Sequence, residues 1–302
     1  MKILIIGGNG YIGSALYNHL SQKNYDVDSV DLCLFGEDLG FSIKTNYNNF
    51  YTDTYTHIIL LAAHSSVKMA DYNKQNAWLN NVTYFYDLCE KLKEHQTLVY
   101  ASSASVYGRN PGLSTEDQLN VYPINNYDLT KITNDIIANN FIHQKKNIVG
   151  LRFGTVNGVS SNIRSDLMIN SMYYSAKTKN KIFIKNSNIH RPILSTKDLV
   201  NAIDKLINSN IVSGQYNVSS FNSTVKDIAE TVSEIWNVPI IDRGNDNYSD
   251  VYDFMLDTSS FSMTYDFEFK ETIRDIASDF ESLDTINNFL PRNDDRLFNG
   301  YL

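Results

Sequence analysis

Short apolar runs alternate with helical patterns through the first half of the chain. Runs with the length of buried strands stand at 3–6, 27–32, 57–63, 97–101 and 148–153. Between them, apolar residues recur at helical spacing, as in Leu79, Val82, Phe85, Leu88 and Leu92. This alternation predicts βαβ units that form a parallel sheet with helices on both faces and right-handed crossovers.

The second half of the chain has a less regular pattern. Helices are predicted over 165–177, 198–207 and 224–236, and short strands at 182–184 and 214–218. From Asn288 onward the sequence is polar with a few apolar anchors. We expect this C-terminal tail, 288–302, to be either loose or packed on a partner.

Three glycines follow the first apolar run. In Gly7-Gly8-Asn9-Gly10-Tyr11-Ile12-Gly13, the first allows a tight turn, the second lets backbone approach a pyrophosphate and the third lets helix and strand pack closely. The N-terminus of the next helix offers free N–H groups to phosphates. Strand, glycine turn and helix in this order predict a dinucleotide site at Gly7, Gly10 and Gly13.

Asp31 ends the second predicted strand, near the expected distance beyond the glycine turn. An acid at this place accepts hydrogen bonds from the adenosine ribose and repels a 2′-phosphate. No Arg or Lys follows until Lys44. The sequence therefore favours NAD over NADP as the cofactor.

Tyr127 and Lys131 lie four residues apart at the start of a helical segment, so they project from one helix face. An adjacent ammonium stabilises a phenolate, which makes a tyrosine useful in proton transfer. The pair follows the strand that ends in Ser102-Ser103-Ala104-Ser105. Ligands of parallel sheets sit at the carboxyl ends of strands, so Ser103 is expected beside the same substrate oxygen as Tyr127.

Composition limits the partners of this chain. Its 302 residues are 42% hydrophobic, enough for a substantial core, and the net charge of -8 argues against nucleic acid. No run approaches the roughly 20 apolar residues of a membrane span. Cys33, Cys89 and the histidines show no metal spacing, so no metal is expected. No secretory signal is visible, and we expect a soluble cytoplasmic protein.

Four motifs together resemble a known family. They are Gly7-x-x-Gly10-x-x-Gly13, Leu61-Ala62-Ala63-His64, Ser102-Ser103-Ala104-Ser105-Val106-Tyr107-Gly108 and Tyr127-x-x-x-Lys131. In this order they resemble the extended short-chain dehydrogenases/reductases, in the nucleotide-sugar epimerase/dehydratase branch. Leu151-Arg152-Phe153-Gly154-Thr155-Val156-Asn157-Gly158 and His190-Arg191-Pro192-Ile193-Leu194-Ser195 extend the resemblance over roughly residues 1–280.

The resemblance implies a role for each candidate residue. Tyr127 is the general base, Lys131 holds the nicotinamide ribose and tunes Tyr127, and Ser103 orients the substrate hydroxyl. Arg191 binds the diphosphate of a nucleotide sugar, a task suited to a forked cation. Arg164 and Asn170 line the substrate pocket. The NAD site comprises Gly7, Gly10, Tyr11, Ile12, Gly13, Asp31, Leu61, Ala62, Ala63, Tyr127 and Lys131.

The resemblance also implies an architecture. We expect a doubly wound parallel Rossmann sheet in an NAD-binding domain of residues 1–160 and about 190–220. A smaller, discontinuous α/β substrate domain takes about 161–189 and 221–287. A homodimer is expected through a four-helix contact that uses helices 76–92 and 127–144 of each copy.

Several positions depart from the family's pattern. Dehydratases of this branch carry an acid between the catalytic residue and the Val-Tyr-Gly, where this chain has Ala104 and Ser105. Asn157 replaces a usual Tyr, and Val159 a usual Pro. An Arg expected near the C-terminal end corresponds to Tyr252. One diphosphate contact is thus either missing or supplied by Arg243.

These observations favour an NAD-dependent nucleotide-sugar 4-epimerase, in which a transient 4-keto sugar forms and is reduced on its other face. A nucleotide-sugar 4-oxidase or 4-ketoreductase would use the same residues. A non-catalytic NAD-sensing protein is the more distant alternative, because such proteins usually lose the Tyr–Lys pair.

Overall fold

The computed structural model describes residues 1–110, 112–118, 123–246, 251–283 and 289–290. Its centre is a seven-stranded sheet in the order β12-β7-β5-β4-β1-β2-β3, and every neighbouring pair is parallel. The strands are β1 Lys2–Ile6, β2 Asp26–Asp31, β3 Ser42–Lys44, β4 His57–Leu60, β5 Thr97–Ser103, β7 Asn147–Phe153 and β12 Gly214–Val218. The strand order reverses between β1 and β4, which places a ligand crevice at their carboxyl ends. The predicted parallel Rossmann sheet is confirmed.

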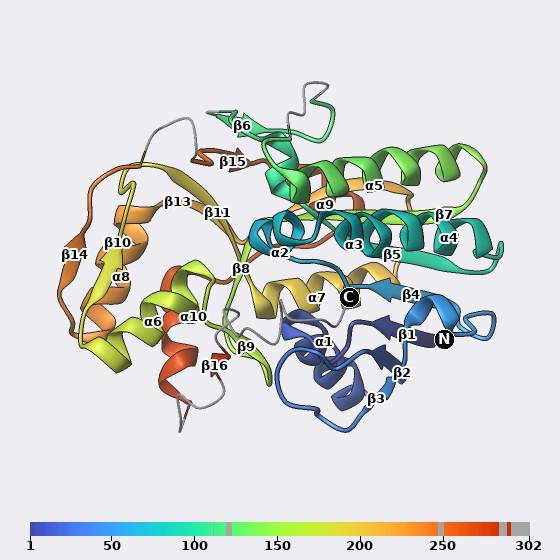
Figure 1. The fold of residues 1–302 in the computed structure, drawn as a ribbon, viewed down its shortest axis with the longest axis horizontal. Helices are drawn as coiled ribbons and strands as arrows, with labels where there is room; N and C mark the ends of the chain where they lie inside the picture. The colour runs from blue at the N-terminus through green and yellow to red at the C-terminus, as the bar shows by residue number, and fades with distance from the viewer. Residues whose placement is uncertain (111, 119–122, 247–250, 284–288, 291–302) are drawn as a thin grey trace.

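Side chains of the sheet alternate between two cores, as the period of a strand requires. Ile3, Ile5 and Ile59 face one core, with α1 Tyr11–Gln22 and α7 Thr196–Ile207. Leu4, Ile6 and Ile58 face the other, with α4 Tyr84–Lys91 and α5 Asn126–His143. Figure 1 shows these helices along the two faces of the sheet. The sheet is therefore buried on both sides, which accounts for its nearly continuous apolar runs.

One predicted helix is divided in three. The segment expected as a single helix over 76–92 contains α3 Lys74–Trp78, a π turn over Leu79–Thr83, and α4. The wider turn rotates Leu79 outward to 41% exposure and buries Asn81. Leu79 therefore does not share the buried face of Val82, Phe85, Leu88 and Leu92, because an even helical spacing takes no account of the extra residue in a π turn.

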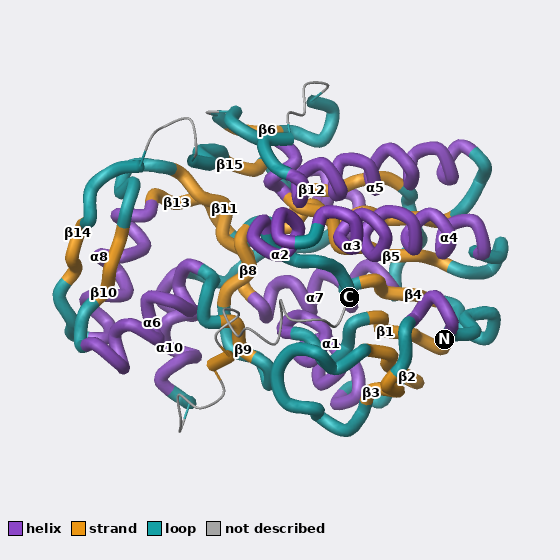
Figure 2. The backbone as a smooth tube through the Cα atoms, in the orientation of Figure 1, coloured by secondary structure: helices purple, strands orange, loops and turns teal. Residues whose placement is uncertain are grey.

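The remaining elements gather beside the carboxyl edge of the sheet (Figure 2). The helices α6 Met168–Lys179, α8 Val225–Trp236 and α10 Ile273–Glu281 pack together near the parallel pair β10 Ile182–Ile184 and β14 Ile240–Asp242. A three-stranded sheet, β13 Phe221–Thr224, β11 His190–Ser195 and β8 Thr155–Asn157, runs from them toward the main sheet. The division into a cofactor and a substrate domain stays a prediction.

Short elements complete the described chain. They include α2 Val67–Tyr72, η1 Tyr47–Asn49, η3 Ala104–Tyr107, α9 Ser259–Tyr265 and the pairs β6 Leu113–Ser114 with β15 Met255–Leu256 and β9 Ile163–Arg164 with β16 Phe289–Leu290. Of the predicted tail 288–302, only the backbone of 289–290 is described. No helix in the described part of the chain has the length and apolar character of a membrane span.

Gly150 gives a test of the central packing. It pairs with Tyr100 on the neighbouring strand, and a Cβ at Gly150 would lie 2.5 Å from the Tyr100 ring. We expect Gly150→Ala to lower the free energy of unfolding by about 1–3 kcal/mol, because the ring has no free space to move into. Urea unfolding measures this change.

The matched variant is Gly150→Ala combined with Tyr100→Leu. The second change removes the clashing ring. The losses in the free energy of unfolding of the two single variants should therefore sum to more than the loss in the double variant. Additive losses would show that the Tyr100 ring does not cause the strain.

Candidate active site

The glycine turn packs directly against the loop that follows β4. Gly7 has φ +93°, and a Cβ there would lie 2.5 Å from Ala62 N. A Cβ on Gly13 would lie 2.0 Å from Gly7 O. The backbone N–H groups of Leu61 and Ala62 each donate to Ile6 O, at 2.8 and 2.9 Å respectively. Only glycine therefore fits at positions 7 and 13, and α1 starts with no side-chain cap on its first N–H groups.

A cavity, here called the cofactor cavity, lies over this turn, and most of the predicted cofactor residues line it, whereas Tyr127 and Lys131 do not. Its lining includes Gly7, Gly10, Tyr11, Ile12, Gly13, Asp31, Leu61, Ala62 and Ala63. Asp31 accepts from Asn9 N at 2.9 Å and Cys33 N at 2.8 Å, which aims the carboxylate at the turn. Burial raises the pKa of Asp31, and these N–H donors oppose that rise. The uncapped helix, the narrow turn and the acid fit the pyrophosphate and ribose of a dinucleotide.

A second cleft of about 640 Å³ continues from the cofactor cavity. Tyr11, Ile12, Leu61, Ala63, Ser65 and Arg164 line both spaces. The cleft also contains Ser103, Tyr127, Lys131 and Arg191. Residues from β5, α5 and β11 thus meet beside the cofactor cavity.

The first turn of α5 positions Tyr127 and Lys131. The side chain of Asn125 caps this helix by accepting from Asp128 N. Lys131 Nζ lies 5.7 Å from the centre of the Tyr127 ring and donates to Ala101 O at 2.7 Å. Burial lowers the pKa of Lys131 to about 8, and Asp135 acts in the opposite direction. The ammonium is thus held in a dry site next to the phenol.

Ser103 ends β5 and caps the short helix η3. Its Oγ accepts from Ser105 N at 3.2 Å and lies 2.8 Å from Ser105 Oγ. The neighbouring Ser102 Oγ is buried and has no hydrogen-bond partner among the described residues. Both serines line the cleft, so hydroxyl groups concentrate on the wall next to Tyr127.

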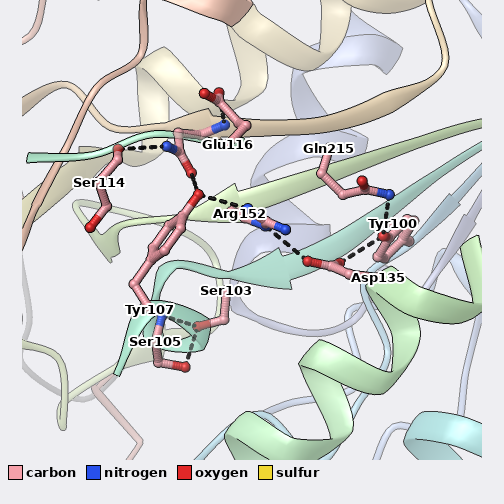
Figure 3. Close-up of polar contacts among 10 residues, drawn as sticks. Tyr100, Ser103, Ser105, Tyr107, Ser114, Glu116, Asp135, Arg152 and Gln215 are labelled. Carbon is pink, nitrogen blue, oxygen red and sulfur yellow. Dashed lines mark hydrogen bonds and ion pairs between the residues drawn. The ribbon is translucent and has the colours of Figure 1, made fainter. Parts of the chain in front are cut away.

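A buried polar network below the cleft was not predicted. Arg152 Nε donates to Asp135 Oδ2 at 2.9 Å, and its Nη1 donates to Tyr107 Oη at 2.7 Å. Tyr100 Oη donates to the other Asp135 oxygen at 2.7 Å. Figure 3 shows Tyr107 reaching from the turn that holds Ser103 and Ser105 to Arg152. The network therefore ties η3 to α5, one turn beyond Lys131. Tyr107 and Arg152 stand in the motifs quoted above, but no sequence pattern joined them to Asp135.

The π turn supplies another residue that the sequence analysis missed. Asn81 Oδ1 accepts from His64 N at 2.7 Å, and Asn81 Nδ2 donates to Thr130 Oγ1 at 3.1 Å. His64 lines the cofactor cavity, and Thr130 lies between Tyr127 and Lys131 in sequence. Asn81 thus joins the loop beside the cofactor cavity to the turn of α5 that holds Tyr127 and Lys131.

Arg191 enters the cleft from β11, and no described residue forms an ion pair with it. Its Nη2 donates to Thr155 Oγ1 at 3.2 Å, whereas its buried Nε has no partner among the described residues. The ion pairs of the described chain include Arg152, Arg164 and Arg274 but not Arg191. Burial lowers the pKa of Arg191. An anionic ligand would satisfy such a cation.

Two other predicted substrate residues lie in different positions. Arg164 stands where the two cavities join and binds Asp166 in bidentate fashion at 2.9 and 2.7 Å. Asn170 does not reach either cavity. It is fully buried, accepts from Gly158 N at 3.0 Å and donates to Arg164 O at 2.9 Å. Because these bonds occupy its amide, Asn170 supports the Arg164 segment and does not contact substrate, which corrects the prediction.

The structure also places the remaining candidates. Arg243 does not line the cleft, and its guanidinium packs 3.8 Å from the centre of the Phe183 ring. Tyr11 lines both cavities, but its buried hydroxyl donates to Gly158 O at 2.8 Å. Among the described residues, no group of His, Cys, Asp and Glu has the arrangement of a metal site.

Lys131 gives a pH test of this site. Its folded pKa of about 8 lies below the usual 10.5, so between these values the unfolded chain binds more protons. Stability from this group therefore rises with pH. We expect the unfolding free energy of the wild type, relative to Lys131→Met, to rise from pH 7.5 to 10, by at most roughly 1.4 kcal/mol per pH unit.

Urea unfolding at several pH values measures the difference, with the exposed Lys74→Met as the matched control. Lys74 should show no such slope. If the difference in unfolding free energy between the wild type and Lys131→Met does not change with pH, the Lys131 ammonium is not held in a dry site.

Comparisons with known proteins agree with this geometry. The profile of the NAD dependent epimerase/dehydratase family matches residues 3–219. Protein CapI of Staphylococcus aureus is 29% identical over 234 residues, which cover 68% of this chain and 69% of that protein. ADP-L-glycero-D-manno-heptose-6-epimerase of Brachyspira hyodysenteriae is 25% identical over 259 residues, covering 78% and 81%.

A solved structure has the same fold. UDP-glucuronic acid 4-epimerase from Bacillus cereus, in complex with UDP-glucuronic acid and NAD, superposes with a TM-score of 0.80. The two chains are 21% identical, and the match covers 92% of this chain and 97% of the other. Because the family profile matches residues 3–219, which are more than half of the sequence, this chain belongs to the NAD-dependent epimerase/dehydratase family and is an NAD-dependent enzyme.

Proposed function

We propose that this enzyme is a nucleotide-sugar 4-epimerase. The observation that carries the proposal is that Ser103, Tyr127 and Lys131 share one cleft, which continues into the cavity over the glycine turn. The two positions after Ser103 are Ala104 and Ser105, so the acid used for dehydration is missing there. The names of the similar proteins, a 6-epimerase and a 4-epimerase, support inversion of a sugar carbon.

The chain's own groups have distinct tasks in this proposal. Tyr127 takes the proton from the sugar hydroxyl and later returns it, while the neighbouring Lys131 ammonium stabilises the phenolate. Ser103 holds the reacting oxygen by a hydrogen bond. NAD, held by the glycine turn, Asp31 and the loop after β4, supplies the hydride chemistry when bound. Lys131 would also hold the nicotinamide ribose when NAD is bound.

Arg191 binds the diphosphate of the substrate. Its partly buried guanidinium has no paired carboxylate among the described residues, and its Nε lacks a partner. A diphosphate offers several acceptor oxygens to such a cation. Arg164 stands where the cavities join and adds a second cation, partly neutralised by Asp166.

Tyr127→Phe tests the reaction. The purified enzyme should invert C4 of at least one UDP-, GDP-, CDP-, ADP- or dTDP-hexose, as followed by proton NMR. The variant should lose about 10³-fold in kcat, because the base is removed while the ring remains. Tyr51→Phe serves as the control, because Tyr51 is exposed and is distant from Tyr127 in the sequence. This variant should retain the wild-type rate.

Two results would contradict the proposal. Turnover with net formation or consumption of NADH and no inversion would indicate an oxidase or ketoreductase. Unchanged activity in Tyr127→Phe would remove this residue from the reaction.

We further propose that the enzyme is a homodimer. Supporting this, large apolar side chains lie exposed on neighbouring helices: Leu129 and Ile136 on α5, and Trp78, Leu79 and Tyr86 along α3, the π turn and α4. Helices α4 and α5 pack side by side (Figure 1). An apolar patch on two adjacent helices suits pairing about a two-fold axis.

Ile136→Asp tests this surface. Ile136 is 63% exposed, and a carboxylate there would be buried without a partner in the dimer. We expect light scattering after size exclusion to show a dimer for the wild type and a monomer for the variant. Met263→Asp on α9, at a residue 78% exposed, should remain a dimer. A monomeric wild type would contradict the proposal.

A further inference from the structure

The guanidinium of Arg191 lies against an aromatic ring instead of a carboxylate. Its Cζ stands 5.9 Å from the centre of the Tyr252 ring, within the range of a cation–π contact. The nearby Asp253 contributes to the electrostatic environment of Arg191, but its carboxylate accepts from His190 N at 2.8 Å. The Tyr252 ring thus supports the cation, while Arg191 Nε remains without a partner among the described residues.

A buried acid fixes the Tyr252 ring. Tyr252 Oη donates to Asp128 Oδ2 at 2.7 Å, and the same oxygen accepts from Ile124 N at 3.2 Å and Asn125 Nδ2 at 3.0 Å. Asp128 has no exposed surface. Burial raises the pKa of Tyr252 far above its usual value, and Asp128 adds to this effect. The phenol therefore stays protonated and remains a hydrogen-bond donor.

We propose that Tyr252, anchored by Asp128, is a positioning platform that holds Arg191 for the diphosphate of the substrate. A carboxylate paired with Arg191 would occupy the N–H groups that bind phosphate oxygens. The ring instead contacts the cation without accepting a hydrogen bond from Nε, which stays available to the ligand. This inference rests on the proposed function, because it presupposes a nucleoside-diphosphate ligand.

The platform also connects two parts of the site. Asp128 follows Tyr127 directly in sequence, in the first turn of α5. Tyr252 belongs to the segment before β15 and lines the cleft together with Arg191. Because the Tyr252 hydroxyl is hydrogen-bonded to both Asp128 and Asn125 at the start of α5, the distance from the diphosphate to the general base depends on this contact. No local sequence pattern joins positions 128 and 252.

Binding measurements on the NAD-saturated protein test the platform. Saturation with NAD blocks the cofactor site, and calorimetry with UDP, dTDP, GDP, CDP and ADP identifies the nucleoside diphosphate that binds most tightly. For that probe we expect Tyr252→Leu and Asp128→Ala each to weaken binding about tenfold, since the ring or its anchor is lost. Tyr252→Phe keeps the ring and should weaken binding about threefold.

Three controls separate positioning from general damage. Asp128→Asn keeps an acceptor for Tyr252 and should bind the probe within about threefold of wild type. Tyr51→Phe should bind like wild type. The Kd for NAD, measured on each variant without added nucleotide, should not change, because the platform lies outside the cofactor cavity.

Each other result overturns the inference. If Tyr252→Leu binds the nucleoside diphosphate as tightly as the wild type does, the Tyr252 platform is not needed. If Tyr252→Leu does not fold, wild-type affinity in Tyr252→Phe overturns the inference. Equal losses in Asp128→Asn and Asp128→Ala, or a parallel loss of NAD binding, would indicate structural damage. If the wild type binds no nucleoside diphosphate, both proposals fail. If it binds one but inverts no sugar, only the proposed epimerase activity fails.

Discussion

Close contact between backbone segments at the glycine turn determines where every other group of the site lies. Gly7 approaches Ala62, and Gly13 approaches Gly7, at distances that exclude a Cβ. This contact brings the end of β1 against the loop after β4, at the point where the strand order reverses. A side chain at either glycine would push α1 away from the sheet. The cofactor cavity and the adjoining cleft would then lose the wall that they share.

The proposed catalytic residues depend on a second layer of contacts. Ser103 and Tyr127 come from different elements, yet Arg152 and Asp135 connect Tyr107 in η3 to helix α5 through two short hydrogen bonds. A buried ion pair of this kind contributes little net stability, because desolvation offsets the attraction. Its consequence is geometric, since it limits how far the serine turn moves relative to α5. Asn81 restrains the same helix from the side of the cofactor loop.

Sequence patterns predicted those features that depend on neighbours along the chain. The apolar runs, the glycine turn, and the Tyr127–Lys131 spacing each depend on local periodicity or on a motif, and the structure contains all of them. The π turn was not predicted, because its apolar spacing is close to that of an ordinary helix. Asn170 was assigned to substrate, but bonds to Gly158 and Arg164 occupy it. Contacts such as that of Asp128 with Tyr252 join distant segments, and only the fold reveals them.

The distribution of charge in the cleft follows from what each cation must do. Arg164 has a bidentate acid partner, whereas Lys131 and Arg191 have no acid in direct contact among the described residues. A direct carboxylate would stabilise either cation, but it would also neutralise the field that each exerts on its target. Lys131 instead uses a backbone carbonyl, and Arg191 uses an aromatic ring. Both arrangements hold a cation in place while leaving its charge directed at the cleft, although burial itself disfavours the charged form of each side chain.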